Sequence, residues 1–410
     1  MVTSRFRKAF LTVSLKEKRN LWIVKRVLSI SLLALGVLQS PVTYAAKNCE
    51  SISWPLWNDF KTNYIKPDGR VVAGSSPQFQ SFSEGQAYAM VFALIANDSK
   101  TFDQLWRWSI ANLFNNNVDS RLPAWTWGRT EDGAWKVLDE NSASDADIWY
   151  AYALLEAGRL WQRKDYAADA NKILALVESQ SIISLPGLGK MLLPGPFGFT
   201  LSPDQWQLNP SYLPIPVLRR LALNNKKGPW SEIAINTGKM ISASSPKGFA
   251  PDWVNYQAQS ADAGKFIVDA TKGEIGSYDA IRVYLWAGMT PAKDPLTKSI
   301  MNSLVGMNNM IQISGNPPEK VNTLTGSSSG DAPLGFSAAV APFLKASNKN
   351  ALLKSQTERA QLLRYLSPPA PYYDYVLSLF GMGWIENHYR FSDNGQIILN
   401  WNPACTPKIS

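Results

Sequence analysis

The chain contains few of the side chains on which catalytic sites most often depend. Its 410 residues include one histidine, His388, and two cysteines, Cys49 and Cys405. Histidine-based triads, most zinc sites and thiol catalysis therefore lack the residues they need. Neither cysteine has the spacing of a redox or metal-binding motif, so we expect no metal or other cofactor. The chemistry that remains rests on carboxylates and aromatic side chains.

A serine hydrolase is excluded because its motif lacks the required context. Residues 326–330 read Gly-Ser-Ser-Ser-Gly and match the pattern G-x-S-x-G. That pattern forms a nucleophile elbow only after a strand and together with a triad histidine. We interpret the segment as a Ser/Gly loop, and we interpret His388 as structural.

Charge is also scarce, and most of the net positive charge lies at the N-terminus. Charged residues make up 18% of the chain, whose formal net charge is +9. Residues 1–26 contain eight basic residues and one acidic residue, which amounts to +7 and leaves +2 for everything that follows. The basic character belongs to the leader and gives no case for a nucleic-acid partner.

The apolar stretch near the N-terminus is short. Residues 27–38 follow Lys25-Arg26 and precede small residues that end in Ala45-Ala46. This order is typical of a secretory signal peptide, so we expect residues 1–46 to be removed during export. The alternative, an uncleaved anchor, would need roughly 20 apolar residues to span a bilayer. The mature protein is then periplasmic or extracellular, with no stable membrane insertion.

Export would place the two cysteines in a compartment where they can form a disulfide. Cys49 and Cys405 lie near the two ends of the mature chain. A disulfide between them is plausible in an oxidising compartment, because the termini of a domain often lie close together. Two unpaired thiols are the alternative.

The mature part is expected to form one domain over residues 47–410. It has no charge block, low-complexity tract or long linker, and clusters of Pro and Gly separate segments of helical periodicity. Strand signals are sparse, which indicates an all-α fold. Helices are predicted over 86–96, 102–113, 147–161, 167–179, 216–223, 277–288 and 372–380.

Two of these helices are apolar on every side. The segments 87–96 and 148–155 have no polar face, whereas 167–179 alternates polar and apolar faces. A helix without a polar face must be buried all round. The patterns together favour a ring of buried helices inside a ring of amphipathic ones.

Three acidic segments come directly before or within apolar helices. They contain Glu84 in Ser-Glu-Gly-Gln, Asp145 in Ser-Ala-Ser-Asp-Ala-Asp, and Asp279 in Ser-Tyr-Asp-Ala-Ile-Arg. Each serine or acid could simply cap a helix, which contributes about 0.5–2 kcal/mol. Buried helices of a ring that begin at a common end would instead gather the three acids at one rim. Aromatic residues cluster around these segments: Trp125, Trp127, Trp149, Tyr278, Tyr284 and Trp286.

Carboxylates among aromatic residues suit polysaccharide hydrolysis, which needs one carboxylic acid and one carboxylate. A helix N-terminus lowers the pKa of a carboxyl group, which suits a base and opposes an acid. For Glu84 to remain protonated, burial and a nearby like charge must outweigh the helix dipole. Asp145 is the candidate for that charge.

The three segments resemble motifs of glycoside hydrolase family 8. Ala143-Ser144-Asp145-Ala146-Asp147 and the apolar helix after it resemble the family signature. The segments around Glu84 and Asp279 resemble those that carry the proton donor and the catalytic base. The likeness runs from about residue 54 to 384. Within this range, further segments that resemble the family are 122–128, 186–195, 209–213, 247–254 and 335–339.

The resemblance implies an (α/α)6 barrel and an inverting endo-β-1,4-glucanase without a metal. Glu84 would be the general acid, and Asp279 would activate water. Asp145 would hold the glucosyl unit and tune Glu84. Further candidates for substrate binding are Trp125, Trp127, Tyr88, Tyr212, Tyr278 and Arg282. Of these, Arg282 would lie one helical turn from Asp279 and could orient it, or could form an ordinary ion pair.

The resemblance also favours a role beside cellulose synthesis, since similar secreted endoglucanases are encoded with bacterial cellulose synthases. The partners would be β-1,4-glucan chains and, functionally, the synthase complex. Two alternatives remain open. One is a β-glycanase for xylan, chitosan or mixed-linkage glucan, and the other is a glucan-binding component of the synthase without turnover.

Overall fold

The computed structural model describes residues 52–73, 78–366 and 371–401, and residues Asn48–Ser410 group into one compact unit. The expected signal peptide at 1–46 and the cysteines Cys49 and Cys405 lie outside the described residues. Among the residues that are described, no helix is long and apolar enough to cross a membrane.

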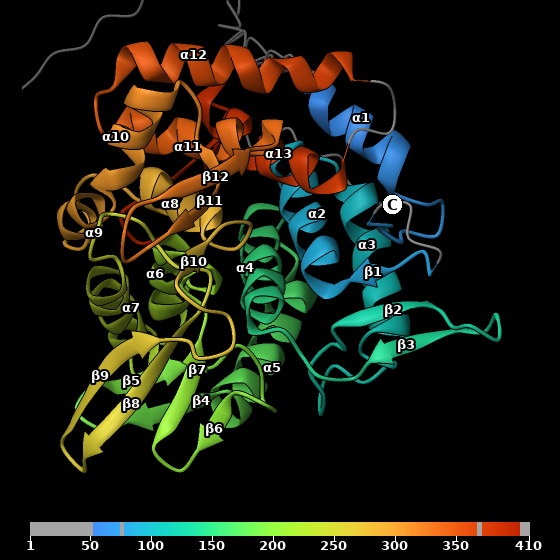
Figure 1. Ribbon diagram of the computed structural model, residues 1–410. Helices are drawn as coiled ribbons and strands as arrows, with labels where there is room; N and C mark the ends of the chain where they lie inside the picture. The colour runs from blue at the N-terminus through green and yellow to red at the C-terminus, as the bar shows by residue number, and fades with distance from the viewer. Residues whose placement is uncertain (1–51, 74–77, 367–370, 402–410) are drawn as a thin grey trace, which may run out of the picture. The chain divides into compact units, whose positions relative to one another are not determined.

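The architecture is an (α/α)6 barrel, in which six inner helices are surrounded by outer helices (Figure 1). Along the chain, inner and outer helices alternate. The inner helices are α2 (Ser83–Ile95), α4 (Ser144–Leu160), α6 (Ile215–Asn224), α8 (Ile281–Met289), α11 (Leu334–Ala346) and α13 (Tyr372–Ile385). The outer helices are α1 (Pro55–Tyr64), α3 (Ser99–Asn112), α5 (Lys164–Gln180), α7 (Trp230–Ser244), α9 (Thr297–Ser303), α10 (Val305–Ser314) and α12 (Asn350–Gln361).

The seven predicted helices all exist, with ends that differ by a few residues. The two segments without a polar face became α2 and α4, where almost every side chain is buried. The amphipathic segment 167–179 lies in the outer helix α5, which buries one face only. The apolar pattern thus separates inner from outer helices because only the inner ones lose contact with water on all sides.

Small residues let the inner helices approach closely. A side chain at Gly288 of α8 would overlap the backbone at Phe343 of α11, and one at Gly381 of α13 would overlap the carbonyl of Ala338. Aromatic rings fill the centre between the helices. Those around Phe380 are Phe92 at 4.6 Å, Trp286 at 5.1 Å, Tyr88 at 5.2 Å and Trp149 at 5.4 Å between ring centroids.

Short antiparallel strands line the connections between the helices, although strand signals in the sequence are sparse. The sheets are β1 (Ser81–Phe82) with β2 (Thr126–Arg129) and β3 (Trp135–Asp139); β4 (Ile182–Leu185) with β5 (Gly189–Leu192); β6 (Thr200–Ser202), β7 (Gln205–Leu208), β8 (Val254–Ser260) and β9 (Ala263–Val268); and β10 (Ile275–Gly276), β11 (Pro318–Asn322) and β12 (Ser328–Asp331). A separate hairpin contains β13 (Tyr389–Phe391) and β14 (Ile397–Leu399).

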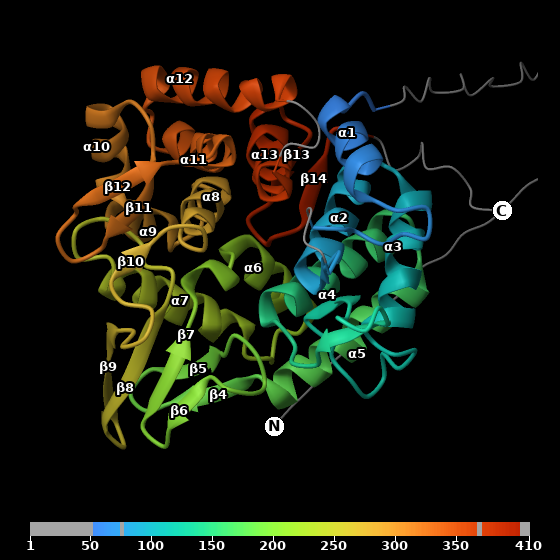
Figure 2. The same ribbon diagram turned by 45° about the vertical axis from the view of Figure 1, so that its right-hand side comes forward.

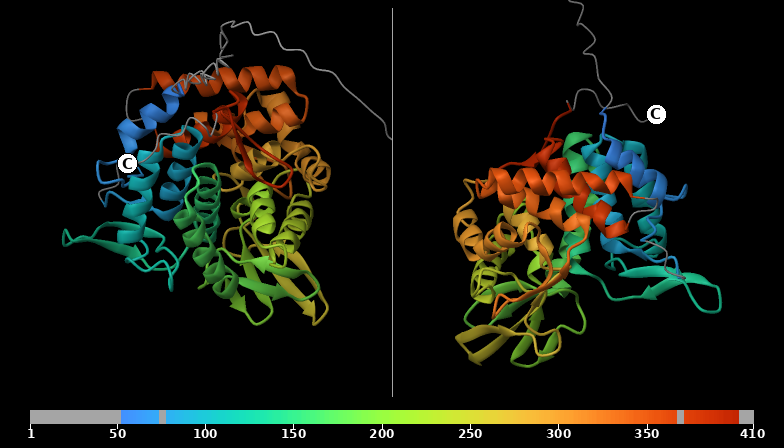
Figure 3. Two further views of the ribbon diagram at one scale, coloured as in Figure 1. Left: turned by 180° about the vertical axis from the view of Figure 1, so that it is seen from behind. Right: turned by 45° about the horizontal axis from the view of Figure 1, so that its top comes forward.

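The strands β1 to β12 all precede inner helices, so they gather where those helices begin. Figures 1 and 3 show β2–β3 on one side of the molecule and β6–β9 on another. The strands therefore build the walls of a site at the N-terminal end of the barrel.

The hairpin β13–β14 follows α13 and lies beside it (Figure 2). It is tied to the C-terminal half of α4. The Glu156 carboxylate accepts a hydrogen bond from the Ile397 backbone nitrogen at 2.9 Å and also pairs with Arg220 and Arg159. Tyr152 donates to the Gly395 carbonyl at 3.0 Å. Buried polar contacts thus fasten this hairpin to the barrel.

Candidate active site

Glu84 lies in the first turn of α2, at the end of the barrel where the inner helices begin. Its carboxylate accepts a hydrogen bond from the indole nitrogen of Trp125 at 3.3 Å. Burial and the nearby Asp145 carboxylate raise the pKa of Glu84 to about 7, against the opposing effects of the helix backbone, Trp125 and Arg282. Burial and like charge therefore outweigh the helix N-terminus, which is the condition for a protonated acid.

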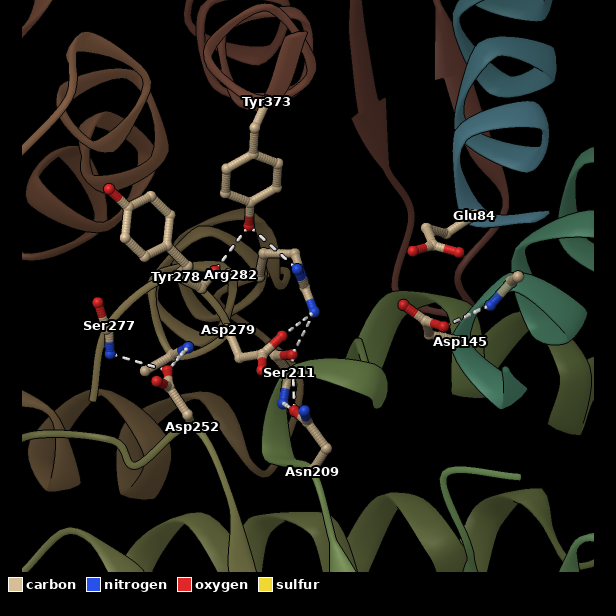
Figure 4. A network of polar contacts seen from close by, with 12 residues as sticks. Glu84, Asp145, Asn209, Ser211, Asp252, Ser277, Tyr278, Asp279, Arg282 and Tyr373 are labelled. Carbon is tan, nitrogen blue, oxygen red and sulfur yellow. Dashed lines mark hydrogen bonds and ion pairs between the residues drawn. The ribbon is translucent and has the colours of Figure 1, made fainter. Parts of the chain in front are cut away.

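Asp145 occupies the equivalent position in the first turn of α4 and is almost fully buried. Its carboxylate accepts hydrogen bonds from the Ala146 backbone nitrogen at 2.8 Å and from the Tyr88 hydroxyl at 3.4 Å. Burial raises the pKa of Asp145 too, although Arg282 and these hydrogen bonds favour its charged form. Because Glu84 and Asp145 face each other (Figure 4), the two carboxyl groups titrate as a pair.

Asp279 lies on the other side of the site (Figure 4). The prediction that it lies inside a helix over 277–288 was wrong. Since α8 begins at Ile281, Asp279 lies in the turn just before it. Its carboxylate forms an ion pair with Arg282 at 2.8 Å, one helical turn further on. An ion-paired carboxylate can accept a proton, as a general base must.

Arg282 is itself held by residues from two other parts of the chain. Its Nη2 donates to Ser211 Oγ at 2.7 Å, and its Nη1 donates to the Tyr373 hydroxyl at 3.0 Å. Tyr373 donates in turn to the Tyr278 carbonyl at 2.7 Å, and Asn209 accepts from Ser211 at 2.7 Å. The guanidinium that positions Asp279 is therefore fixed on both of its terminal nitrogens.

The sequence did not single out Tyr373 or assign a role to Ser211 and Asn209. Tyr373 lies in the first turn of the inner helix α13, and the other two lie at the short 3₁₀ helix Pro210–Tyr212 before α6. Asn209 and Ser211 belong to a segment that resembles the family, which was the one available signal.

The serines near the acids do not cap the helices. The N-cap positions of α2, α4 and α8 are Phe82, Ala143 and Ala280, none of which forms a side-chain cap. Asp252 serves the turn before α8 instead, because it accepts from the backbone nitrogens of Ser277 at 2.8 Å and Ala280 at 2.7 Å. Asp252 therefore caps the turn that leads into α8.

The predicted aromatic residues divide into two groups. Trp125, Tyr88 and Tyr212 lie at the carboxylates: Trp125 contacts Glu84, Tyr88 contacts Asp145, and the ring of Tyr212 lies 5.9 Å from the Arg282 guanidinium. Tyr278 is exposed, and its hydroxyl donates to Glu319 at 3.2 Å. Trp127 contacts none of the three acids and packs against Trp135 instead.

Within residues 52–73, 78–366 and 371–401, no cluster of three His, Cys, Asp or Glu side chains could hold an ion. The sole histidine packs on Trp54 at 4.9 Å, with Glu386 at 3.3 Å, away from the carboxylates. The chemistry available here is donation of a proton by a protonated carboxylic acid and acceptance of a proton by a carboxylate.

Comparison with known proteins gives a consistent picture. The family model "Glycosyl hydrolases family 8" matches residues 36–387. An endoglucanase from Pseudomonas fluorescens (strain SBW25) is 44% identical over 92% of this chain and 98% of its own length. One from Xanthomonas axonopodis pv. citri (strain 306) is 45% identical over 93% of this chain and 98% of its own.

Solved structures agree with these relatives. A crystal structure of an endo-1,4-D-glucanase from Vibrio fischeri ES114 superposes with a TM-score of 0.80 and 39% identity. The match covers 85% of this chain and 99% of that one.

Proposed function

Because the chain belongs to the glycosyl hydrolases of family 8, we propose that it is an endo-β-1,4-glucanase that cuts internal bonds of cellulose chains with inversion. The observation that carries this proposal is the arrangement of three carboxyl groups at one end of the barrel. Burial and Asp145 raise the pKa of Glu84 to about 7, and Asp279 is ion-paired on the other side of the site. The similar endoglucanases support β-1,4-glucan as the substrate.

In the proposed reaction, Glu84 gives its proton to the glycosidic oxygen as the bond from that oxygen to the anomeric carbon breaks. Asp279 takes a proton from a water molecule, whose oxygen attacks the anomeric carbon from the opposite face. This route inverts the anomeric configuration and needs no covalent intermediate. Glu84 regains a proton from solvent, and Asp279 releases one.

Asp145 and Arg282 position groups in this proposal. The Asp145 carboxylate raises the pKa of Glu84, which it faces, and it would hold the glucosyl unit at the cleavage point. Arg282 fixes the direction of Asp279 through their ion pair. Two hydrogen bonds, to Ser211 and Tyr373, hold Arg282 in place.

Aromatic residues beside the acids supply surfaces for glucose rings. Trp125 is 39% exposed although its indole nitrogen contacts Glu84, so one part of the ring remains available to a sugar. The hydroxyls of Tyr88 and Tyr212 are further candidates for contacts with the glucosyl unit.

The test is the release of reducing ends from carboxymethylcellulose, compared with xylan, chitosan and mixed-linkage glucan. The proposal expects the cellulosic substrate to be cut fastest. Faster cleavage of xylan or chitosan would show that this other glycan, and not cellulose, is the preferred substrate. Binding of cellulose without any turnover by the folded protein would favour the non-catalytic alternative.

We further propose export through cleavage of residues 1–46 and a role in assisting cellulose synthesis. Export is supported by the basic and apolar order of the N-terminal segment. A disulfide between Cys49 and Cys405 would follow from export. N-terminal sequencing of the periplasmic protein tests the cleavage, and its mass with and without reductant after thiol alkylation tests the disulfide.

A further inference from the structure

A group of aromatic side chains lies beyond the carboxylates, on the wall formed by β2 and β3. We call it the aromatic shelf and define it as Phe79, Trp127 and Trp135 together with Arg70. Phe79 is 43% exposed and Trp135 is 46% exposed, although both are large apolar side chains. Exposed apolar rings that cluster rather than scatter indicate a binding surface.

The shelf is held rigidly. Trp127 and Trp135 stack with ring centroids 5.2 Å apart, and the Arg70 guanidinium lies 5.2 Å and 4.7 Å from them. Trp108 of α3 supports Trp127 edge-on at 5.4 Å. The rings therefore lose little freedom when a ligand binds, which favours affinity.

The backbone at Phe79 is unusual in a way that supports a binding role. Its φ is +46°, a left-handed conformation that bulky residues rarely adopt. The Phe79 carbonyl accepts from Arg70 at 3.3 Å, and the preceding carbonyl of Gln78 accepts from the Arg129 backbone nitrogen at 2.8 Å. Gly128 allows this approach, because a Cβ there would lie 2.8 Å from the Gln78 oxygen. An exposed ring held in a costly conformation is typical of a functional site.

The shelf begins close to the catalytic centre in the chain. Trp125 is exposed in the bend just before β2, and Trp127 is half-buried in β2 itself. Over two residues of extended chain, the backbone positions of Trp125 and Trp127 are separated by roughly 7 Å. Trp125 contacts Glu84, whereas Trp127 contacts Trp135 and Arg70 of the shelf. The residue that contacts the acid and the first ring of the shelf are thus two positions apart in the chain.

We propose that the aromatic shelf binds a β-1,4-glucan chain outside the catalytic centre, so that a long chain lies over Trp125 and continues across Trp135. This inference rests on the proposed function. The flat apolar faces of the rings suit the C–H faces of glucose, and the charge of Arg70 is held against the indoles. The shelf therefore favours long chains and contributes nothing to a chain too short to reach it.

The experiment compares Trp135→Ala with the unsubstituted protein on short and long substrates. We expect kcat/KM on cellotetraose to stay the same, while kcat/KM on carboxymethylcellulose falls roughly threefold to tenfold, as for the loss of one aromatic contact. Retention on amorphous cellulose is measured in the inactive Glu84→Gln background and should weaken by a similar factor. Trp135→Tyr should restore most of both.

Tyr365→Ala is the matched control, since Tyr365 is 83% exposed and follows α12, far from β3 in the chain. If Trp135→Ala and Tyr365→Ala had the same kcat/KM on long chains and the same retention, the proposal that the shelf binds glucan would be overturned. An equal loss of kcat/KM on short and long substrates for Trp135→Ala would also overturn it. Failure of the proposed function looks different: the unsubstituted protein would not cut cellotetraose. The retention assay reports on the shelf even then, because it needs no turnover.

Discussion

Glu84 and Asp145 begin two neighbouring inner helices, α2 and α4, and their carboxyl groups face each other at the same end of the barrel (Figure 4). Two helix N-termini would ordinarily keep both groups ionised. Burial and mutual repulsion raise the pKa of Glu84 to about 7 instead. The fold thus produces a protonated carboxylic acid near neutral pH from residues that capping alone would leave charged.

Glu84→Gln should abolish turnover, because the amide cannot donate the proton that the leaving oxygen needs. We expect kcat to fall about 10²- to 10⁴-fold, the range of general acid catalysis. Binding of cellulose and the unfolding temperature should stay unchanged. The matched control is Glu358→Gln, an exposed acid of α12 that pairs loosely with Lys354. Activity of Glu84→Gln near that of the control would remove Glu84 from the role of acid.

The pH dependence should report the Glu84–Asp145 pair. A raised pKa keeps Glu84 protonated below about pH 7, so kcat/KM should fall as pH rises through that value. Asp145→Asn removes the repulsion that contributes to the raised pKa. The alkaline limb of the profile should therefore move to lower pH, whatever the loss in kcat. An alkaline limb at the same pH or at a higher pH would show that Asp145 does not raise the pKa of Glu84.

Arg282→Met should lower kcat about 10²-fold and change KM little, because a misdirected base impairs the chemical step more than binding. Arg282→Lys should recover part of the loss, since lysine keeps the charge without the two-pronged geometry. Arg219→Met is the control. Arg219 pairs with Asp294 at 2.6 Å, and neither contacts the three site carboxylates. A fall in stability with unchanged kcat for Arg282→Met would reduce Arg282 to a structural ion pair.

Glu156→Gln should destabilise the fold without changing kcat per folded molecule. The carboxylate is fully buried and pairs with Arg220, whose side chain is 8% exposed. Removing one partner of a buried pair costs about 3–5 kcal/mol in the free energy of unfolding. Urea denaturation measures this, and Glu358→Gln should change it by less than about 1 kcal/mol. Equal stability of the two variants would contradict the role assigned to the buried network.

Inner helices were predictable where their sequences are uninterrupted. The runs that became α2 and α4 contain no polar face, and burial follows directly from that. By contrast, α11 was missed although ten of its residues are buried. It contains Pro342 and begins at a Pro333-Leu334-Gly335 sequence, which are the usual signs of a break. The segment packs against both α8 and α13, and this packing keeps it helical despite its local preferences.

The three acids of the candidate site could be predicted from the sequence, whereas the hydrogen-bond network around Arg282 could not. The acids carry local signals, because each precedes an apolar run. Tyr373 and Ser211 lie 91 and 71 residues from Arg282, and only the closed ring brings them together. Trp135 was overlooked for a similar reason: its partner Arg70 comes from a loop on the far side of α2 and α3 in the chain.

The most direct test of the account is proton NMR of the anomers released while the purified enzyme digests soluble cello-oligosaccharides. If Glu84 is the acid and Asp279 directs water to the opposite face, the α-anomer appears first and mutarotation follows. Initial appearance of the β-anomer would contradict this mechanism, because retention requires a covalent nucleophile, and Asp145 would then be the carboxylate to examine.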